Sequence, residues 1–140
     1  MKSSPHKLVV IGRHVRVSFP DLGFSNVDAK VDTGAFRTVI HCERCEEIQT
    51  DTGKVLEADF MLEGTEIKRL RFNQYFSKEF KRSFGEKEKR FCVKTTIRSG
   101  RKKIKSSVSL TDRSDMKFQV LIGRKTLLRK FVVDVSKKFA

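Results

Sequence analysis

The stretch Val27-Asp28-Ala29-Lys30-Val31-Asp32-Thr33-Gly34-Ala35 decides the fold, because it joins an extended segment to a tight turn that carries one carboxylate. Apolar and charged residues alternate up to Val31, a period of two that is typical of a half-buried strand. Asp32 then lies at the strand end, Thr33 adds a hydroxyl group, and Gly34 allows a second backbone segment to approach closely. We therefore expect a strand at 27–32 that presents a carboxylate at its end.

The sequence on both sides of this stretch predicts a chain built almost entirely of strands. Alternating or continuous apolar runs bounded by Gly, Pro, Asp or Ser are typical of strands joined by tight turns. The expected strands cover residues 8–11, 15–19, 27–32, 38–49, 54–62, 67–72, 91–98, 102–110, 119–122 and 131–135, and a short helix is expected at 124–128. Residues 73–90 carry no pattern that places them. We therefore predict an all-β, barrel-like single domain at 8–140 that follows a flexible leader at 1–7.

The net charge of the chain indicates what kind of partner it binds. The 140 residues include 31 Lys and Arg but only 17 Asp and Glu, which gives a net charge of +14. Such a charge favours an anionic partner, either nucleic acid, an acidic peptide or an anionic membrane. No apolar run is long enough to span a bilayer, and the start of the chain lacks the apolar core of a signal peptide. Three cysteines suit reduced thiols, so we expect a cytoplasmic protein without a membrane partner.

The order of several short motifs resembles the RimB family of retropepsin-like aspartic peptidases, a family formerly labelled an ATP-dependent zinc protease. The matching segments run through nearly the whole chain: Ile11-Gly12-Arg13, Pro20-Asp21-Leu22-Gly23, Ala29 to Ala35, His41, Leu110 to Met116 and Leu121-Ile122-Gly123-Arg124. The resemblance implies a closed retropepsin-like barrel whose active site is shared by two chains. It also implies a substrate, namely the poly-glutamate tails that RimK-type ligases add to a ribosomal protein.

Asp32 is the predicted catalytic residue, and Thr33, Gly34 and Ala35 are the predicted support of its loop. An aspartic peptidase needs two carboxylates on one water: the ionised one removes a proton from the water, and the protonated one polarises the peptide carbonyl. Two carboxylates that lie close together cannot both ionise cheaply, so they share one proton. The resemblance implies that the second carboxylate is Asp32 of a symmetry-related chain in a homodimer.

A second Asp-Thr-Gly, at Asp51-Thr52-Gly53, serves as an internal control. Polar Gln49 and Thr50 precede it and Lys54 follows it, so no apolar strand leads into this carboxylate. We expect this triplet to be a hairpin turn. That hairpin is one candidate for a flap over the active site, and the hairpin at 99–103 is the other.

Four cations are candidates for substrate binding: Lys30, Arg37, Arg113 and Arg124. Strand alternation puts Lys30 on the same face as Asp32, where its charge would favour the ionised carboxylate or hold an acidic substrate. Pairing of Lys30 with Asp28 in solvent is the alternative interpretation. For Arg37 and Arg113 the alternative is an ordinary surface charge.

Arg124 follows Gly123 in the second part of the resemblance. In retroviral relatives this Arg pairs with an Asp just after Asp-Thr-Gly-Ala and braces the dimer. Phe36 occupies that place here, so the brace must differ, and Asp112 and Asp115 are the candidate substitutes.

His41, Cys42 and Cys45 raise the question of a metal site. On one strand their side chains would alternate between faces, and a fourth ligand is not evident, since Cys92 is remote. The sequence contains no His-Glu-x-x-His and no Gly-rich phosphate loop. We therefore predict that no metal and no other cofactor is needed, in spite of the family's former zinc label.

The sequence thus predicts a homodimeric aspartic peptidase that acts on acidic poly-glutamate peptides or on the modified ribosomal protein. Two alternatives stay open. Basic clusters at 87–90, 101–103 and 137–138, interleaved with Phe, allow a catalytically silent RNA- or ribosome-binding module on a retropepsin fold. A general peptidase of other specificity is the second alternative.

Overall fold

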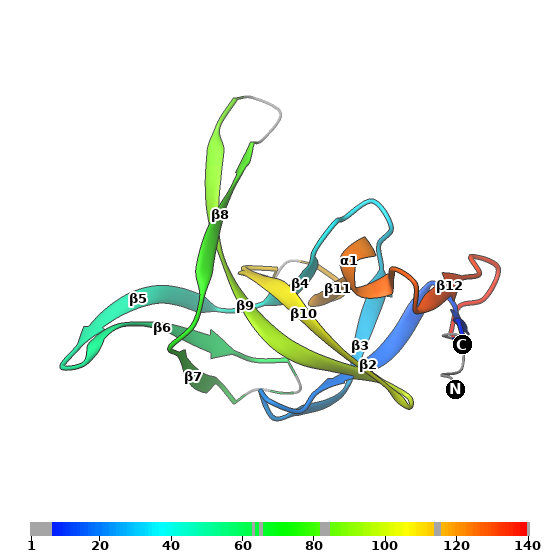
Figure 1. Ribbon diagram of the computed structural model, residues 1–140, viewed down its shortest axis with the longest axis horizontal. Coiled ribbons are helices and arrows are strands. Elements are labelled where there is room, and N and C mark those ends of the chain that lie inside the picture. Colours follow the sequence, from blue (N-terminus) through cyan, green and yellow to red (C-terminus); the bar gives the residue numbers. More distant parts are fainter. Residues whose placement is uncertain (1–6, 63, 65, 82–84, 114–115, 140) are drawn as a thin grey trace, which may run out of the picture.

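The computed structural model describes residues 7–62, 64, 66–81, 85–113 and 116–139. This part of the chain forms twelve strands and one short helix (Figure 1). In chain order the elements are β1 (Val9–Ile11), β2 (His14–Phe19), β3 (Phe24–Val31), β4 (Thr38–His41), β5 (Arg44–Thr50), β6 (Gly53–Phe60), β7 (Lys68–Phe72), β8 (Phe76–Lys81), β9 (Lys87–Ser99), β10 (Lys102–Thr111), β11 (Val120–Ile122), α1 (Arg124–Leu127) and β12 (Phe131–Val133). The leader expected at 1–7 falls, except for residue 7, outside the described residues.

Six of the strands close into a barrel of mixed direction. The order β10-β4-β11-β3-β2-β9 returns to β10, because β9 and β10 also pair with each other. β4 runs parallel to β10 and β3 runs parallel to β11, while the other neighbours in the barrel are antiparallel. β8 extends the sheet beyond β9 and stays outside the barrel. The predicted all-β closed barrel with one short helix is therefore confirmed.

The core follows from the alternation of apolar residues along the strands. In β2 and β3 the side chains of Val15, Val17, Val27 and Ala29 are buried, and the charged residues between them are exposed. Ser18 is the exception, because it is buried although the alternation places it outside. The strand register shifts beside it, and its Oγ accepts a hydrogen bond from the Asn26 backbone N–H at 3.1 Å.

The single strand expected at 38–49 is wrong, because the structure has two strands there that belong to different sheets. β4 lies in the barrel, whereas β5 joins β6 and β7 in a separate three-stranded sheet. The change happens at two consecutive residues: the Cys42 N–H donates to the carbonyl of Thr111 at the end of β10, and the Glu43 N–H donates to the Asp59 carbonyl in β6. Both segments are extended, so the sequence pattern does not reveal the change of partner.

Residues 73–90, which no sequence pattern placed, contain β8 and the beginning of β9. The two strands form a hairpin that projects from the barrel, and Phe76 lies opposite Cys92 at its base (Figure 1). The residues of β8 whose burial is described are all exposed. A strand without a buried face has no reason to alternate apolar and polar residues, which explains the missing signal.

The two ends of the described chain meet in a small parallel sheet. β1 pairs with β12, so residues near the start of the chain lie beside residues near its end (Figure 1). The β9–β10 hairpin reaches this region, because Lys102 Nζ donates to the Lys7 carbonyl at 2.8 Å and lies over the ring of Phe131. Among the described residues no helix has the length and apolar character that crossing a membrane requires.

Candidate active site

Asp32 lies in a short loop, residues 32–37, that connects β3 to β4. The parallel pairing of β3 with β11 continues one residue beyond β3, because the Asp32 N–H donates to the Ile122 carbonyl at 2.9 Å. The loop then turns tightly, and the Ala35 N–H donates to the Asp32 carbonyl at 3.2 Å. The backbone of Asp32 is therefore held on one side by β11 and on the other by the turn of its own loop.

The side chain of Asp32 is oriented by its own loop. Its Oδ1 accepts a hydrogen bond from the Gly34 N–H at 3.0 Å. A Cβ at position 34 would lie 3.2 Å from the same Oδ1, which is a tight contact, so glycine suits this position. Asp32 is partly exposed, and Thr33 and Gly34 are exposed. The loop therefore presents an oriented and partly accessible carboxylate.

Helix α1 holds the other side of the same loop. The Arg124 N–H donates to the Ala35 carbonyl and the Lys125 N–H donates to the Phe36 carbonyl, both at 2.8 Å. A Cβ on Gly123 would lie 2.6 Å from the Arg37 carbonyl carbon, so only glycine allows this approach. The Gly-Arg pair of the sequence motif thus lets the helix start directly against the Asp32 loop.

Three buried hydroxyl groups complete this attachment. Thr38 Oγ1 accepts a hydrogen bond from the Gly123 N–H at 3.1 Å and lies 2.6 Å from Thr126 Oγ1. Thr126 Oγ1 also lies 3.3 Å from Ser106 Oγ in β10. Buried polar groups stabilise a fold only when they are partnered, and these three partner one another. They connect β4, α1 and β10 below the loop.

Arg124 braces the loop through a carbonyl oxygen. Its Nη1 donates to the Thr33 carbonyl at 2.9 Å, and its guanidinium lies 5.8 Å from the centre of the Phe36 ring. Asp112, one of the two expected acidic partners, instead lies 3.6 Å from His41 Nδ1. Asp115, the other, is outside the described residues. The brace in this chain therefore uses the loop backbone and an aromatic ring.

Arg37 and Lys125 share one partner beside the loop. Arg37 Nε donates to Ser107 Oγ at 2.9 Å, and Lys125 Nζ donates to the same oxygen at 2.7 Å. Arg37 was predicted from the sequence, whereas Lys125 and Ser107 were not. The available signal was the run of serines in β10, since Ser107 and Ser109 are buried polar residues that need polar partners.

Lys30 and Arg113 are the two remaining cations that the sequence suggested for substrate binding, and they lie on different parts of the fold. Lys30 is exposed on the same side of β3 as Asp28, as strand alternation predicted. The alternative pairing of these two residues is not formed, because Asp28 Oδ1 accepts from Arg16 Nε at 3.1 Å. Arg113 follows β10, near His41 at the far end of β4 from the Asp32 loop. Its Nε donates to the Phe118 carbonyl at 3.3 Å.

His41 is a structural residue of the barrel. Its side chain is buried, and Nδ1 accepts a hydrogen bond from the Arg113 N–H at 2.7 Å. The proton of the neutral ring is therefore on Nε2, which donates to Glu43 Oε1 at 2.8 Å. The neighbouring thiols contact each other, and this contact lowers the pKa of Cys45 and, together with burial, raises the pKa of Cys42. Both ring nitrogens of His41 are occupied by protein groups.

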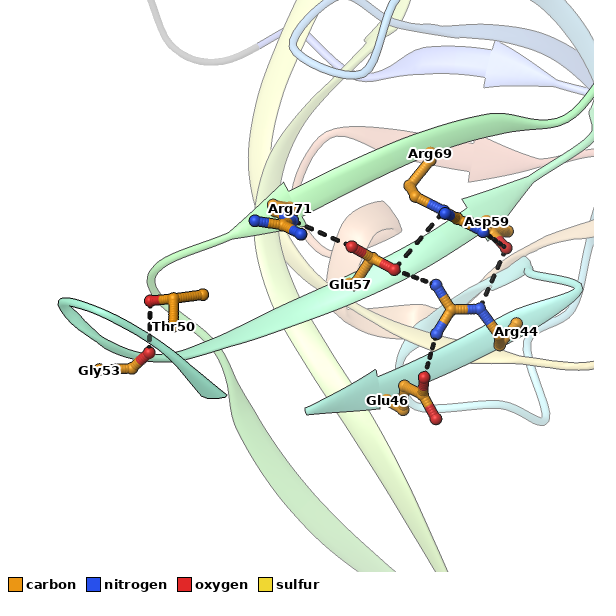
Figure 2. A network of polar contacts seen from close by, with 8 residues as sticks. All are labelled: Arg44, Glu46, Thr50, Gly53, Glu57, Asp59, Arg69 and Arg71. Carbon is orange, nitrogen blue, oxygen red and sulfur yellow. Dashed lines mark hydrogen bonds and ion pairs between the residues drawn. The ribbon is translucent and has the colours of Figure 1, made fainter. Parts of the chain in front are cut away.

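A network of charges covers the outer face of the β5-β6-β7 sheet (Figure 2). Glu57 and Asp59 of β6 are only 5% and 6% exposed. They are bound by three arginines from the flanking strands, Arg44, Arg69 and Arg71. Hydrogen bonds from Arg69 and Arg44 lower the pKa of Asp59 against the effect of burial. Burial works to raise the pKa of Glu57, but the arginines outweigh it and lower that pKa as well.

The second Asp-Thr-Gly is the hairpin turn between β5 and β6, as predicted. Thr50 Oγ1 donates to the Gly53 carbonyl at 2.6 Å, and Asp51 is exposed (Figure 2). The other flap candidate, the β9–β10 hairpin, contacts Lys7 and Phe131 near the chain ends. In Figure 1 its tip lies on the opposite side of the barrel from the loop that follows β3.

The closed barrel and the Asp-Thr-Gly-Ala loop held against a Gly-Arg helix start define a retropepsin-like domain. The chain belongs to the RimB-like family, described as retropepsin-like aspartic endopeptidase RimB, which matches residues 10–140. A solved structure of similar fold is Lpg0085 from Legionella pneumophila, described as a protein with unknown function (DUF785). It has a TM-score of 0.76 and 22% identity, and the similarity covers 96% of this chain and 98% of that one.

Curated relatives carry a different name. A "probable alpha-L-glutamate ligase" from Desulfotalea psychrophila is 26% identical over 128 residues, which are 89% of this chain and 28% of the relative. A protein of the same name from Shewanella pealeana is 29% identical over 135 residues, which are 93% of this chain and 29% of the relative. The chain therefore spans less than a third of the length of these relatives.

Proposed function

We propose that this chain is a cytoplasmic aspartic endopeptidase that hydrolyses peptide bonds in acidic, poly-glutamate tails. In this proposal the enzyme is a homodimer, and Asp32 from each chain contributes to one dyad. The observation that carries the proposal is the position of Asp32, whose backbone is held by Ile122 and whose carboxylate is oriented by the Gly34 N–H. A carboxylate held in this way needs no rearrangement to bind a water.

The proposed reaction uses the two carboxylates in different protonation states. The ionised Asp32 takes a proton from the bound water, whose oxygen attacks the peptide carbonyl carbon. The protonated carboxyl of the partner's Asp32 gives its proton to the carbonyl oxygen. When the tetrahedral intermediate collapses, the C–N bond breaks and the leaving nitrogen takes a proton from one carboxyl group. A hydroxyl group of the intermediate gives its proton to the other carboxylate, so the dyad again holds one proton. The exposed loop, with Gly34 and Thr33 on its surface, gives an extended peptide room to reach the dyad.

The choice of substrate is supported by charge and by the relatives. A net charge of +14 attracts an acidic peptide and raises the rate of encounter, an effect that falls as salt increases. The curated relatives are named as glutamate ligases, and this chain resembles a part of each of them. A peptidase domain related to proteins of that name is well suited to a substrate made of glutamate.

The test compares Asp32→Asn with Asp51→Asn on a poly-glutamate peptide and on casein. We expect the Asp32 variant to lose all hydrolysis while keeping its fold and oligomeric state, and the Asp51 variant to retain its activity. Pepstatin should inhibit the wild type, and light scattering should give a dimer. An active Asp32 variant would contradict the proposal. Binding to ribosomal RNA by a wild type without hydrolysis of either substrate would favour a catalytically silent module instead.

A further inference from the structure

Two cations converge on one neutral oxygen at the outer face of β10. Ser107 Oγ accepts hydrogen bonds from both Arg37 Nε and Lys125 Nζ, and Ser107 itself is only 2% exposed. An arginine has five N–H donors and a protonated lysine has three. Because each side chain makes one hydrogen bond to Ser107, most of these N–H donors have no partner among the described residues. The hydroxyl proton of Ser107 also needs an acceptor, because its oxygen already accepts twice.

No counter-ion for these two cations is found among the described residues. Within the described residues, neither Arg37 nor Lys125 forms an ion pair with a carboxylate. The contrast with Figure 2 is informative, because the arginines there surround the buried carboxylates Glu57 and Asp59. Four cations also lower the pKa of the nearby Cys92 thiol, although burial, the larger effect, raises it: Arg37, Lys78, Arg90 and Lys125. The surface beside the Asp32 loop is therefore strongly positive.

Ser109 gives an independent sign of a missing acceptor. It is 1% exposed, and its Oγ has no hydrogen-bond partner among the described residues. Ser107 and Ser109 lie two residues apart in β10, so both side chains are on the same outer face. Buried hydroxyl groups are normally partnered, and an unpartnered one calls for an explanation. An acceptor from outside this chain would provide that partner once the side chains that cover Ser109 moved aside.

Arg37 is preorganised for this acceptor. Its guanidinium lies 5.6 Å from the centres of both the Phe36 and the Phe76 rings. Contacts with aromatic faces restrict an arginine while its N–H groups stay available at the edge of the guanidinium plane. A cavity of about 290 Å³ is lined by Phe76, the aromatic neighbour of Arg37, together with Gln74, Tyr75 and Lys94. Lys94 lies opposite Ser107 in the strand register, which links the cavity to the same face.

The cluster is also fixed relative to Asp32. Arg37 ends the loop that Asp32 begins, and the Lys125 N–H is bonded to the Phe36 carbonyl of that loop. A peptide that places its scissile bond at Asp32 and runs on past Phe36 would bring a side chain to the two cations. The donors there are too many for a neutral amide and match a carboxylate, which has about four acceptor positions.

We propose that these residues form a carboxylate-binding subsite that receives an acidic side chain of the substrate. The subsite consists of Arg37, Ser107, Ser109 and Lys125. This inference rests on the proposed function for the identity of the peptide. It goes further by assigning recognition of the acidic side chain to this cluster.

The experiment measures binding of tetra-glutamate and tetra-glutamine peptides to the full chain that carries Asp32→Asn, so that hydrolysis does not interfere. Arg37→Gln and Lys125→Met are each expected to weaken tetra-glutamate binding by about tenfold or more, because each removes a charge-assisted hydrogen bond. Binding of tetra-glutamine should change less than about twofold, since a neutral amide gains little from either cation. Ser109→Ala, which leaves the net charge unchanged, should weaken tetra-glutamate binding by a few fold.

The matched control is Arg101→Gln, which removes the same charge from an exposed position at the tip of the β9–β10 hairpin. An equal loss for Arg101→Gln and Arg37→Gln would overturn the subsite, because it would show general attraction only. Unchanged binding by both Arg37→Gln and Lys125→Met would overturn it as well. The proposed function is tested separately by the hydrolysis assay. If the wild type hydrolyses no peptide but tetra-glutamate binding still depends on Arg37, the subsite is supported and the peptidase function is contradicted.

Discussion

Arg124 donates a hydrogen bond from Nη1 to the carbonyl oxygen of Thr33 at 2.9 Å, across 91 positions of the sequence. The same guanidinium lies over Phe36, at the place where retroviral relatives have an acidic residue. The first residue of α1 and the Asp-Thr-Gly loop are therefore joined within one chain. The position of Asp32 depends on this contact, which makes it a useful target for mutation.

Arg124→Met should lower kcat for the poly-glutamate peptide by about tenfold to a hundredfold, because small displacements of a catalytic group have effects of that size. The melting temperature should fall only slightly, since the residue is exposed. Arg98→Met, at an exposed position of β9, is the control and should leave kcat unchanged. A rise in KM with unchanged kcat would show that Arg124 binds substrate and does not position the loop.

Gly123→Ala should destabilise the fold by about 1–3 kcal/mol, the usual cost of forcing an extra atom into a packed site. The new Cβ would lie 2.6 Å from the Arg37 carbonyl carbon, so the loop or the helix must move. Urea denaturation of this variant and of Gly64→Ala gives the comparison. A Cβ at Gly64 would have no atom within 4 Å, and that variant should match the wild type. Equal midpoints for the two variants would contradict the close packing at Gly123.

Lys30→Met should reduce kcat/KM for the poly-glutamate peptide more than for a neutral peptide. Lys30 is exposed on β3 two residues before Asp32, so its charge attracts an acidic substrate toward the loop. The rate of the variant should also fall less steeply as salt is raised. Lys138→Met, which removes the same charge elsewhere, is the control. Equal losses on both peptides would show that Lys30 only supports the fold.

The stability of the protein should fall in acid because of Glu57 and Asp59. Their pKa values are lowered in the folded state, so the unfolded state binds protons more tightly. Their stabilising effect is therefore complete above the unfolded values, roughly pH 4, and is lost as the pH falls through the lower folded values. Asp59→Asn should flatten this slope in urea denaturation between about pH 5 and pH 2. Asp51→Asn, in the exposed turn, should keep the slope of the wild type.

Removal of metals should leave activity unchanged. One ring nitrogen of His41 is hydrogen-bonded to Glu43 and the other to Arg113. A metal ion would have to displace one of these partners in order to bind. Hydrolysis of the poly-glutamate peptide should be the same before and after dialysis against a chelator. Activity that is lost in the chelator and restored by added zinc, with stoichiometric zinc in elemental analysis, would refute this expectation.

The elements with one buried face could be predicted from sequence. In β2 and β3 the alternation of Val15, Val17, Val27 and Ala29 with polar residues gave both the strands and their buried sides. The turn after β3 was also predictable, because the close approach of Gly34 to the Asp32 carboxylate is a local requirement of the backbone. These features depend on near neighbours or on burial, and both leave a pattern in the sequence.

Other features depend on which segments meet, and the sequence carries no pattern for that. The change of sheet at Cys42 and Glu43 is made by backbone hydrogen bonds, which any residues can form. The pairing of Arg37 with Ser107 spans 70 positions. The described residues of β8 in the projecting hairpin are all exposed, so this strand has no alternation. The candidate subsite around Ser107 was invisible for the same reason, although the serines of β10 could have drawn attention to it.

The attachment of the Asp32 loop to β11 and α1 also sets the moment at which the site can form. Chains emerge from the ribosome in order, and Asp32 emerges long before Ile122, Gly123 and Arg124, which hold it in place. A nascent chain that ends before these residues has the carboxylate but no anchored loop. The anchored loop is therefore postponed until residues 122–124 have been synthesised.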